Sequence, residues 1–128
     1  MNGEKLGHIL IIEDNRDTQT LLKYLLGADY NLQIVGEFNQ AIEVANEASF
    51  DLLLIDINLG EERTGVDLLN ILRETDPYND VPMIAITAYA MPGDFQRFIN
   101  IGFDAYISKP FTRHDLINTI KNFIPKNI

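Results

Sequence analysis

The sequence predicts an α/β domain in which five parallel strands form one doubly wound sheet, in the order 2-1-3-4-5, with helices on both faces. Five short apolar runs alternate with segments of helical periodicity along the 128 residues. Three of these runs are continuously apolar, as in parallel strands that are covered on both faces. The crossovers are expected to be right-handed, and five strands of this size favour the stated order. Length and even composition predict a single domain over residues 1–128, with its core at about residues 6–124.

The apolar runs are too short for helices, so each is assigned to a strand. The expected strands are His8–Ile12, Leu32–Val35, Leu52–Ile55, Met83–Thr87 and Tyr106–Ile107. Between them the apolar residues repeat with a helical period. The first helix is expected to begin near Asn15, the second to follow Asn39 as its N-cap, and the third to follow Gly65.

The last two helices are predicted from their end signals. The fourth is expected to open at Pro92, because proline suits the first helical position. The fifth opens with Thr112, whose spacing to Asp115 follows the capping-box pattern, and Pro125 is expected to end it.

The composition excludes several functional classes. A net charge of −9 is repelled by phosphate backbones and anionic membranes, so neither nucleic acid nor a membrane is an expected partner. The absence of cysteine excludes disulfides, thiolate metal sites and cysteine nucleophiles. No apolar run approaches the ~18 residues of a membrane span, and no signal-peptide core is present, so a cytoplasmic location is expected. The two histidines, His8 and His114, lack metal-ligand spacing and are expected to be structural.

Charged and polar residues stand at the carboxyl ends of the expected strands. Glu13 and Asp14 follow the first strand, Asp56 follows the third, Thr87 ends the fourth and Lys109 comes after the fifth. Strands 1, 3, 4 and 5 are consecutive neighbours about 4.8 Å apart in the predicted order. These side chains are therefore expected to meet at one edge, where doubly wound sheets place their ligand crevice.

This set of residues has the chemistry of an aspartyl-phosphate site. Three carboxylates at one edge repel each other unless a cation intervenes, and magnesium prefers oxygen ligands. Lys109 supplies a fixed positive charge for a phosphoryl group, and Thr87 supplies a hydroxyl donor. Asp56 is the expected nucleophile, because it alone follows the central strand directly.

Four segments, in order, make the chain resemble a response-regulator receiver domain of two-component signalling, similar to the chemotaxis regulators. They are the pair Glu13–Asp14 and the segments 52–58, 86–88 and 102–111. The resemblance covers about residues 6–124 and implies a flavodoxin-like (βα)5 sandwich. Because the chain stops shortly after the fifth helix, no output domain is expected.

The resemblance implies a ligand set for magnesium and a phosphoacceptor. Asp56 would accept a phosphoryl group from a phosphohistidine on a sensor histidine kinase or a phosphotransfer protein. Magnesium would be held by Asp14, the Asp56 carboxylate, the main-chain carbonyl of Asn58, and Glu13 directly or through water. The domain would catalyse its own phosphorylation and slow dephosphorylation, and would turn over no external substrate.

The resemblance also implies a switch. Thr87 and Lys109 would bind the phosphoryl oxygens, and Tyr106 matches the aromatic residue that turns inward when Thr87 moves toward the phosphate. The Lys109–Pro110 bond would be cis. A downstream protein target is expected on the face made by the fourth helix, the fifth strand and the fifth helix, where Phe95 is expected to be exposed.

Two positions depart from the family pattern, and three other classes fit less well. Gly60 stands where the family often has proline, and Gly65 comes one position late, so the loop Leu59–Thr64 is expected to be one residue longer.

A flavin carrier of this architecture needs a phosphate-binding loop after its first strand. Glu13 and Asp14 stand there instead, and their carboxylates would repel a phosphate. A haloacid-dehalogenase-type hydrolase needs Asp-x-Asp after its first strand. A docking module that is never phosphorylated usually lacks part of the site, whereas this chain has all of it.

Overall fold

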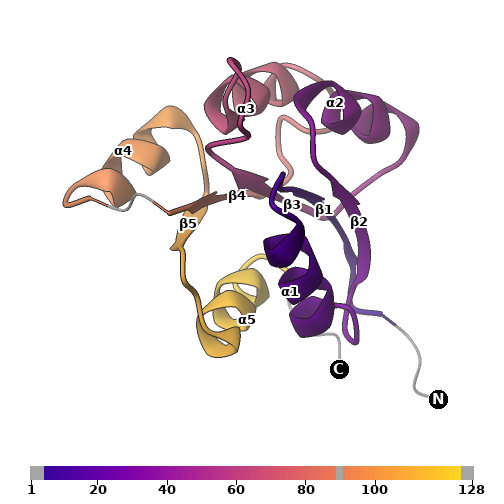
Figure 1. The fold of residues 1–128 in the computed structure, drawn as a ribbon. Coiled ribbons are helices and arrows are strands. Elements are labelled where there is room, and N and C mark those ends of the chain that lie inside the picture. The colour runs from indigo at the N-terminus through magenta and orange to yellow at the C-terminus, as the bar shows by residue number, and fades with distance from the viewer. Residues whose placement is uncertain (1–4, 89–90, 125–128) are drawn as a thin grey trace.

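A computed structural model describes residues 5–88 and 91–124 as a sheet between two layers of helices (Figure 1). The strands are β1 His8–Ile12, β2 Asn31–Val35, β3 Leu52–Asp56, β4 Met83–Thr87 and β5 Ala105–Ser108. The helices are α1 Arg16–Leu26, α2 Phe38–Glu47, α3 Gly65–Arg73, α4 Asp94–Ile101 and α5 Arg113–Lys121. All pairings are parallel and the order is β2-β1-β3-β4-β5, which confirms the predicted fold.

Three strands extend further than predicted. Asn31 pairs with His8 at the start of β2, and Asp56 pairs with Ile86 at the end of β3. β5 is longer by one residue at each end, because Ser108 pairs with Thr87 and the residue before Tyr106 pairs with β4. Three of the four added residues are polar, because the backbone ladder runs to the edge of the sheet, where no apolar side chain is needed.

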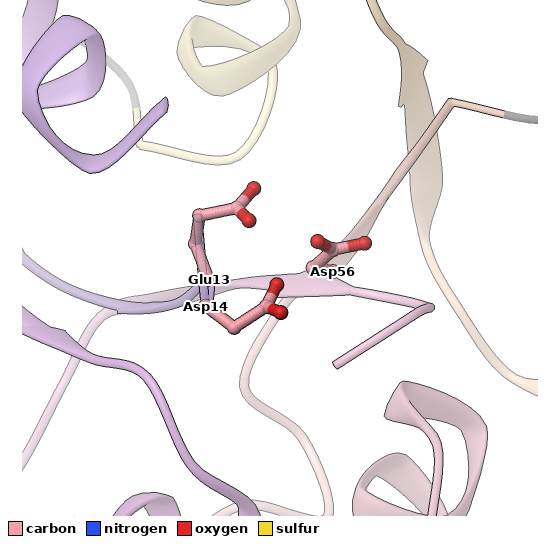
Figure 2. A group of neighbouring side chains, drawn as sticks. All are labelled: Glu13, Asp14 and Asp56. Carbon is pink, nitrogen blue, oxygen red and sulfur yellow. The ribbon is translucent and has the colours of Figure 1, made fainter. Parts of the chain in front are cut away.

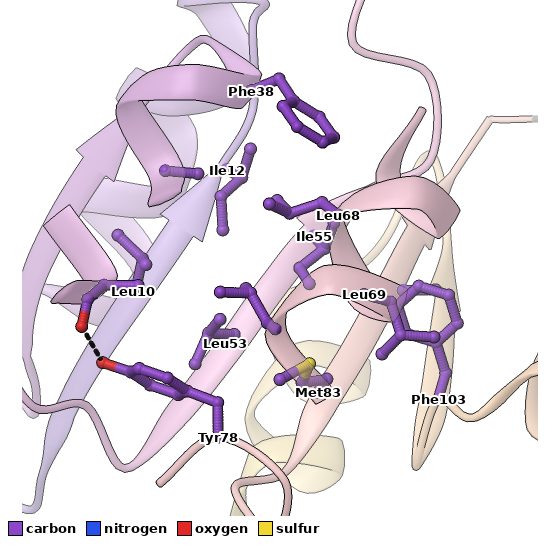
Figure 3. Packing of buried hydrophobic residues seen from close by; sticks show 14 of the residues in the cluster. Leu10, Ile12, Phe38, Leu53, Ile55, Leu68, Leu69, Tyr78, Met83 and Phe103 are labelled. Atoms are coloured by element: carbon purple, nitrogen blue, oxygen red, sulfur yellow. Dashed lines mark hydrogen bonds between the residues drawn. The ribbon is translucent and has the colours of Figure 1, made fainter. Parts of the chain in front are cut away.

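The sheet separates two hydrophobic clusters. Alternate residues of β1 face opposite sides: Leu10 and Ile12 pack beneath α2 and α3, whereas Ile9 and Ile11 pack beneath α1 and α5. Figure 3 shows the first cluster, which also holds Phe98 of α4. Both faces of the central strands are therefore covered, as their continuous apolar sequences predict.

Side-chain caps fix the starts of three helices near the site. The side chain of Asn15 accepts from Thr18 N at the start of α1, and Thr64 forms a capping box with Asp67 at the start of α3. Thr112 accepts from the backbone N–H three residues later at the start of α5, which confirms it as the N-cap and gives one of the two hydrogen bonds of the predicted capping box.

The predicted starts of two helices are wrong by two residues each. The N-cap of α2 is Glu37 rather than Asn39, because Phe38 must enter the core and the Asn39 amide oxygen accepts from another loop. α4 begins at Asp94 rather than Pro92, because Gly93 adopts a left-handed conformation with φ of 89°. α5 ends at Lys121, and Pro125 lies outside the described residues.

The amino ends of the central strands are closed by a polar network. The hydroxyl of Tyr78 donates to the carbonyls of Ala45 and Ala48 at 2.7 and 2.8 Å. Arg73 pairs with Asp104 at 2.8 Å.

In the part of the chain that the structure describes, no helix is long and apolar enough to cross a membrane.

Candidate functional site

Three carboxylates gather at the carboxyl edge of the sheet, as the sequence predicts. Glu13 and Asp14 follow β1, and Asp56 ends the neighbouring β3 (Figure 2). One carboxylate oxygen of each lies within 4.8 Å of the others. They border a cavity of about 340 Å³ whose lining residues are Glu13, Asp14, Asn15, Thr18, Asp56, Asn58, Gly60, Ala88 and Lys109.

The backbone after β1 turns the two acidic residues in different directions. Glu13 N still donates to Val35 O of β2 at 3.0 Å, so Glu13 continues the ladder and its side chain is fully buried. Its Oε2 accepts from Asn15 N at 3.0 Å. Asp14 is exposed at the cavity, where it is accessible to an ion from solvent.

Lys109 is the cation that faces these carboxylates. Its Nζ lies 2.8 Å from Glu13 Oε1 and 3.3 Å from Asp56 Oδ2. Lys109 N donates to Thr87 O at 2.8 Å, which continues the β4–β5 register, and the Lys109–Pro110 bond is cis, as expected. Among the described residues, this ion pair with Lys109 is the contact that compensates the buried Glu13 Oε1, which has no further hydrogen-bond donor.

The electrostatics of the site raise the pKa of Asp56, so its ionised form is disfavoured relative to a carboxylate in water. Burial is the main cause that raises the pKa of Asp56, to about 7, and the Glu13 carboxyl beside it adds to the shift. The Lys109 ammonium and the Asn58 N–H oppose this shift. For Lys109 itself, burial lowers the pKa, but Glu13 and Asp56 outweigh burial and raise it above its usual value.

The loop after β3 folds back over Asp56. Asn58 N donates to Asp56 Oδ1 at 3.0 Å, which holds the carboxylate in place. Gly65 N donates to Ile57 O at 2.9 Å, and a Cβ on Gly65 would clash with the Asp56 carbonyl oxygen and lie 2.9 Å from Ile55 Cγ2. Despite its late position in the sequence pattern, Gly65 thus allows α3 to approach the end of β3 closely.

Thr87 and Tyr106 occupy the neighbouring strands. Thr87 is buried at the end of β4, on the strand next to Asp56. The ring of Tyr106 lies between those of Phe95 and Phe98, with centroid distances of 5.7 and 5.8 Å. Phe95 is 54% exposed and Phe98 is buried, so the prediction of an exposed Phe95 is confirmed.

The donor set fits a hard divalent cation. The three carboxylates supply oxygen ligands only, and the single Lys109 ammonium that faces them cannot balance three negative charges. Magnesium suits such a site, because it binds through a few carboxylates and keeps several waters.

Comparison with known proteins identifies the family. Residues 9–121 match the model of the response regulator receiver domain. The chain belongs to the response regulator receiver domain family. Receiver domains act in phosphorylation-dependent two-component signalling, so the function inferred from the resemblance is confirmed at this level.

Individual relatives support the assignment. The chain is 36% identical to the polar-differentiation response regulator DivK of Brucella anthropi over 117 residues, which cover 91% of this chain and 94% of that protein. It is similar, at 30% identity and a TM-score of 0.83, to the receiver domain of a Pseudomonas aeruginosa sensor histidine kinase solved with magnesium in its active-site cleft; the match covers 92% and 97% of the two chains. The chemotaxis protein CheY4 of Vibrio cholerae shares the fold at 22% identity and a TM-score of 0.83, over 91% and 97% of the chains.

Sequence reasoning missed several residues of this receiver domain's site. Asn15 and Thr18 line the cavity, and Gly60 lies against Asp14. Asn15 and Thr18 could have been found from sequence, because they occupy the cap and first turn of the helix that follows the acidic pair. Gly60 carries no comparable signal, since its place depends on how the loop folds.

Proposed function

We propose that Asp56 is the phosphoacceptor of this receiver domain. The observation that carries the proposal is the position of its carboxylate, with the Lys109 ammonium 3.3 Å away and the carboxylates of Glu13 and Asp14 beside it. An Asp56 oxygen attacks the phosphorus of a phosphohistidine on a partner kinase or phosphotransfer protein. The P–N bond breaks, and the imidazole keeps the electron pair and takes up a proton.

The other residues at this edge hold the reacting groups. Lys109 and Thr87 bind the phosphoryl oxygens with a fixed charge and a hydroxyl. Asp14, the Asp56 carboxylate and the main-chain carbonyl of Asn58 hold magnesium, with Glu13 bound to it directly or through water. When bound, magnesium supplies positive charge that offsets the carboxylates and the incoming phosphoryl oxygens. Water later hydrolyses the acyl phosphate and restores the Asp56 carboxylate, and apart from the phosphodonor the domain turns over no external substrate.

Labelling with acetyl phosphate and magnesium tests the phosphoacceptor. Mass-spectrometric mapping is expected to place one phosphoryl group on Asp56. The Asp56→Asn variant is expected to carry none, because a carboxamide is not a nucleophile toward phosphorus. The matched control is Asp80→Asn, which alters an exposed carboxylate outside the site. Label that persists undiminished in Asp56→Asn would show that another residue is the acceptor.

Magnesium titration tests the metal ligands without any phosphate. Asp14→Ala is expected to weaken magnesium binding at least tenfold, because it removes an exposed carboxylate from a cluster of three. Amide NMR shifts of Asn58 and Gly60 report binding, and the same spectra show whether the fold is kept. Equal affinity in the wild type and Asp14→Ala would contradict the ligand set.

The proposal includes a switch through Tyr106. Beryllofluoride, which mimics the phosphoryl group, is expected to shift the amide signals of Phe95 and Tyr106 as well as those of the site. In Thr87→Ala the shifts at the site are expected to remain while those at the two aromatic residues disappear. Shifts confined to the site in the wild type would rule out the switch.

The proposed partners follow from this chemistry. The phosphodonor is a sensor histidine kinase or a phosphotransfer protein, and a downstream protein binds the face of α4, β5 and α5, where Phe95 is exposed. A cytoplasmic location and a single domain over residues 1–128 complete the proposal.

A further inference from the structure

The loop between β3 and α3, residues 57–64, is attached to the first turn of α2 by two charged side chains. Glu61 Oε2 accepts from Phe38 N at 3.0 Å. The guanidinium carbon of Arg63 lies 3.9 Å from the centroid of the Phe38 ring, and its Nη2 donates to Asn39 Oδ1 at 2.7 Å. Three contacts thus join this loop to a helix that lies earlier in the chain.

The first turn of α2 is a firm anchor for these contacts. Its N-cap residue Glu37 makes no side-chain cap hydrogen bond and its first turn has no acidic residue, so the Glu61 carboxylate supplies the cap. Phe38 is fully buried in the same hydrophobic cluster as Leu59 of the loop. The ring on which Arg63 stacks is therefore fixed by the core.

The opposite side of the loop forms a wall of the acidic cavity. Asn58 N donates to Asp56 Oδ1 at 3.0 Å, and Gly60 N donates to Asn58 Oδ1 at 3.1 Å. Gly60 has φ of 70°, and a Cβ there would lie 2.9 Å from Asp14 Oδ2. The main chain from Asn58 to Gly60 is thus packed directly against the carboxylates of Asp14 and Asp56.

We infer that Glu61 and Arg63 are positioning residues for the metal site, which hold the main chain of Asn58 and Gly60 beside Asp14. This inference rests on the proposed magnesium site. When either attachment to α2 is lost, the loop samples other conformations. Magnesium must then order the loop as it binds, and this entropy cost weakens its affinity.

Substitutions of Arg63 separate this effect from simple electrostatics. Arg63→Ala removes a positive charge from the loop that borders the acidic cavity, which by Coulomb's law alone would strengthen magnesium binding. Loss of the attachment predicts the opposite, a dissociation constant about twofold to fivefold higher, as expected for one cation–π contact and one hydrogen bond. Arg63→Lys keeps the charge but not the planar guanidinium. It is also expected to bind magnesium more weakly, whereas electrostatics alone predicts no change.

The matched control for Glu61 is its neighbour in the same loop. Glu61→Ala and Glu62→Ala remove equal charge, but Glu62 is exposed and has no hydrogen bond or ion pair with any described residue. Glu61→Ala is expected to weaken magnesium binding more than Glu62→Ala does. The readouts are the amide shifts of Asn58 and Gly60 in magnesium titrations, and urea unfolding confirms that each variant is folded.

The possible results are distinct. Arg63→Ala that binds magnesium as tightly as the wild type or more tightly, or equal losses in Glu61→Ala and Glu62→Ala, would overturn the positioning role and leave the proposed function intact. If Arg63→Ala does not fold, Arg63→Lys decides by the same criterion. A wild-type protein that binds no magnesium would overturn the proposed metal site itself.

Discussion

Asp56→Asn is expected to stabilise the metal-free protein by on the order of 2 kcal/mol above about pH 7. The wild-type carboxylate is buried beside Glu13, and these two causes raise its pKa to about 7, although Lys109 and Asn58 oppose them. An amide of the same shape removes the cost of this buried charge. The gain in stability is smaller than the full pKa shift would give, because the variant also loses the attraction between Asp56 and Lys109.

The sign of the pH dependence follows from proton binding. An unfolded aspartate titrates near about pH 3.9, whereas folded Asp56 titrates near 7. Between these values the folded state binds more protons than the unfolded state, so the free energy of unfolding falls as pH rises through this window. The difference between Asp56→Asn and the wild type is therefore expected to be near zero at about pH 4 and largest above about pH 7.

Urea unfolding in the presence of a chelator measures this difference at each pH. Groups that do not interact with Asp56 titrate equally in both proteins and cancel, so the difference reports Asp56 together with the groups that contact it. Saturating magnesium should reduce it, since the ion compensates the charge in the wild type alone. A difference that stays constant between about pH 4 and pH 8 would mean that Asp56 titrates like an exposed carboxylate.

Gly65→Ala is expected to destabilise the protein by about 2 to 3 kcal/mol, although alanine is the better helix former. The added Cβ would overlap the Asp56 carbonyl oxygen and crowd Ile55 Cγ2 at 2.9 Å. Backbone on both sides must then move, and the hydrogen bond from Gly65 N to Ile57 O would be strained. Since Asp56 ends the displaced strand, weaker magnesium binding should accompany the loss of stability.

Gly36→Ala is the matched control for this substitution. A Cβ on Gly36 would meet its nearest atoms, in Gln19, Asp14 and Glu13, at 3.5 Å or more, which is ordinary van der Waals contact. Chemical unfolding is expected to show a change within about 0.5 kcal/mol for this variant. Similar losses for both glycines would mean that chain flexibility, rather than steric overlap, explains the effect.

The sequence was sufficient to predict the sheet and the residues at its carboxyl edge. Runs such as Leu52–Ile55 are too short for helices and suit strands buried on both faces, and five such strands favour the doubly wound order. Once the order is known, Asp56 and Lys109 must approach each other, because their strands end at the same edge. These predictions depend on backbone geometry, which is nearly the same in every sheet of this kind.

The details that sequence could not predict depend on contacts between distant segments. The start of α2 was misplaced because Asn39, a good capping residue, binds Arg63 instead, and the cap comes from Glu61. The pKa of Asp56 depends on burial by the surrounding chain more than on the neighbouring charges that sequence makes visible. Local propensity carries no information on either effect.

The covering of the central strands on both faces limits how the length of this chain can change during evolution. Because Ile9 and Ile11 serve one hydrophobic cluster while Leu10 and Ile12 serve the other, inserting or deleting one residue in β1 would exchange the two sets and mismatch both clusters at once. The loop 57–64 has no such alternation, and it can lengthen provided that Gly65 stays against Asp56 and that Glu61 and Arg63 keep their contacts with α2. Length variation among related domains is therefore expected to concentrate in this loop and to be nearly absent from β1, β3 and β4.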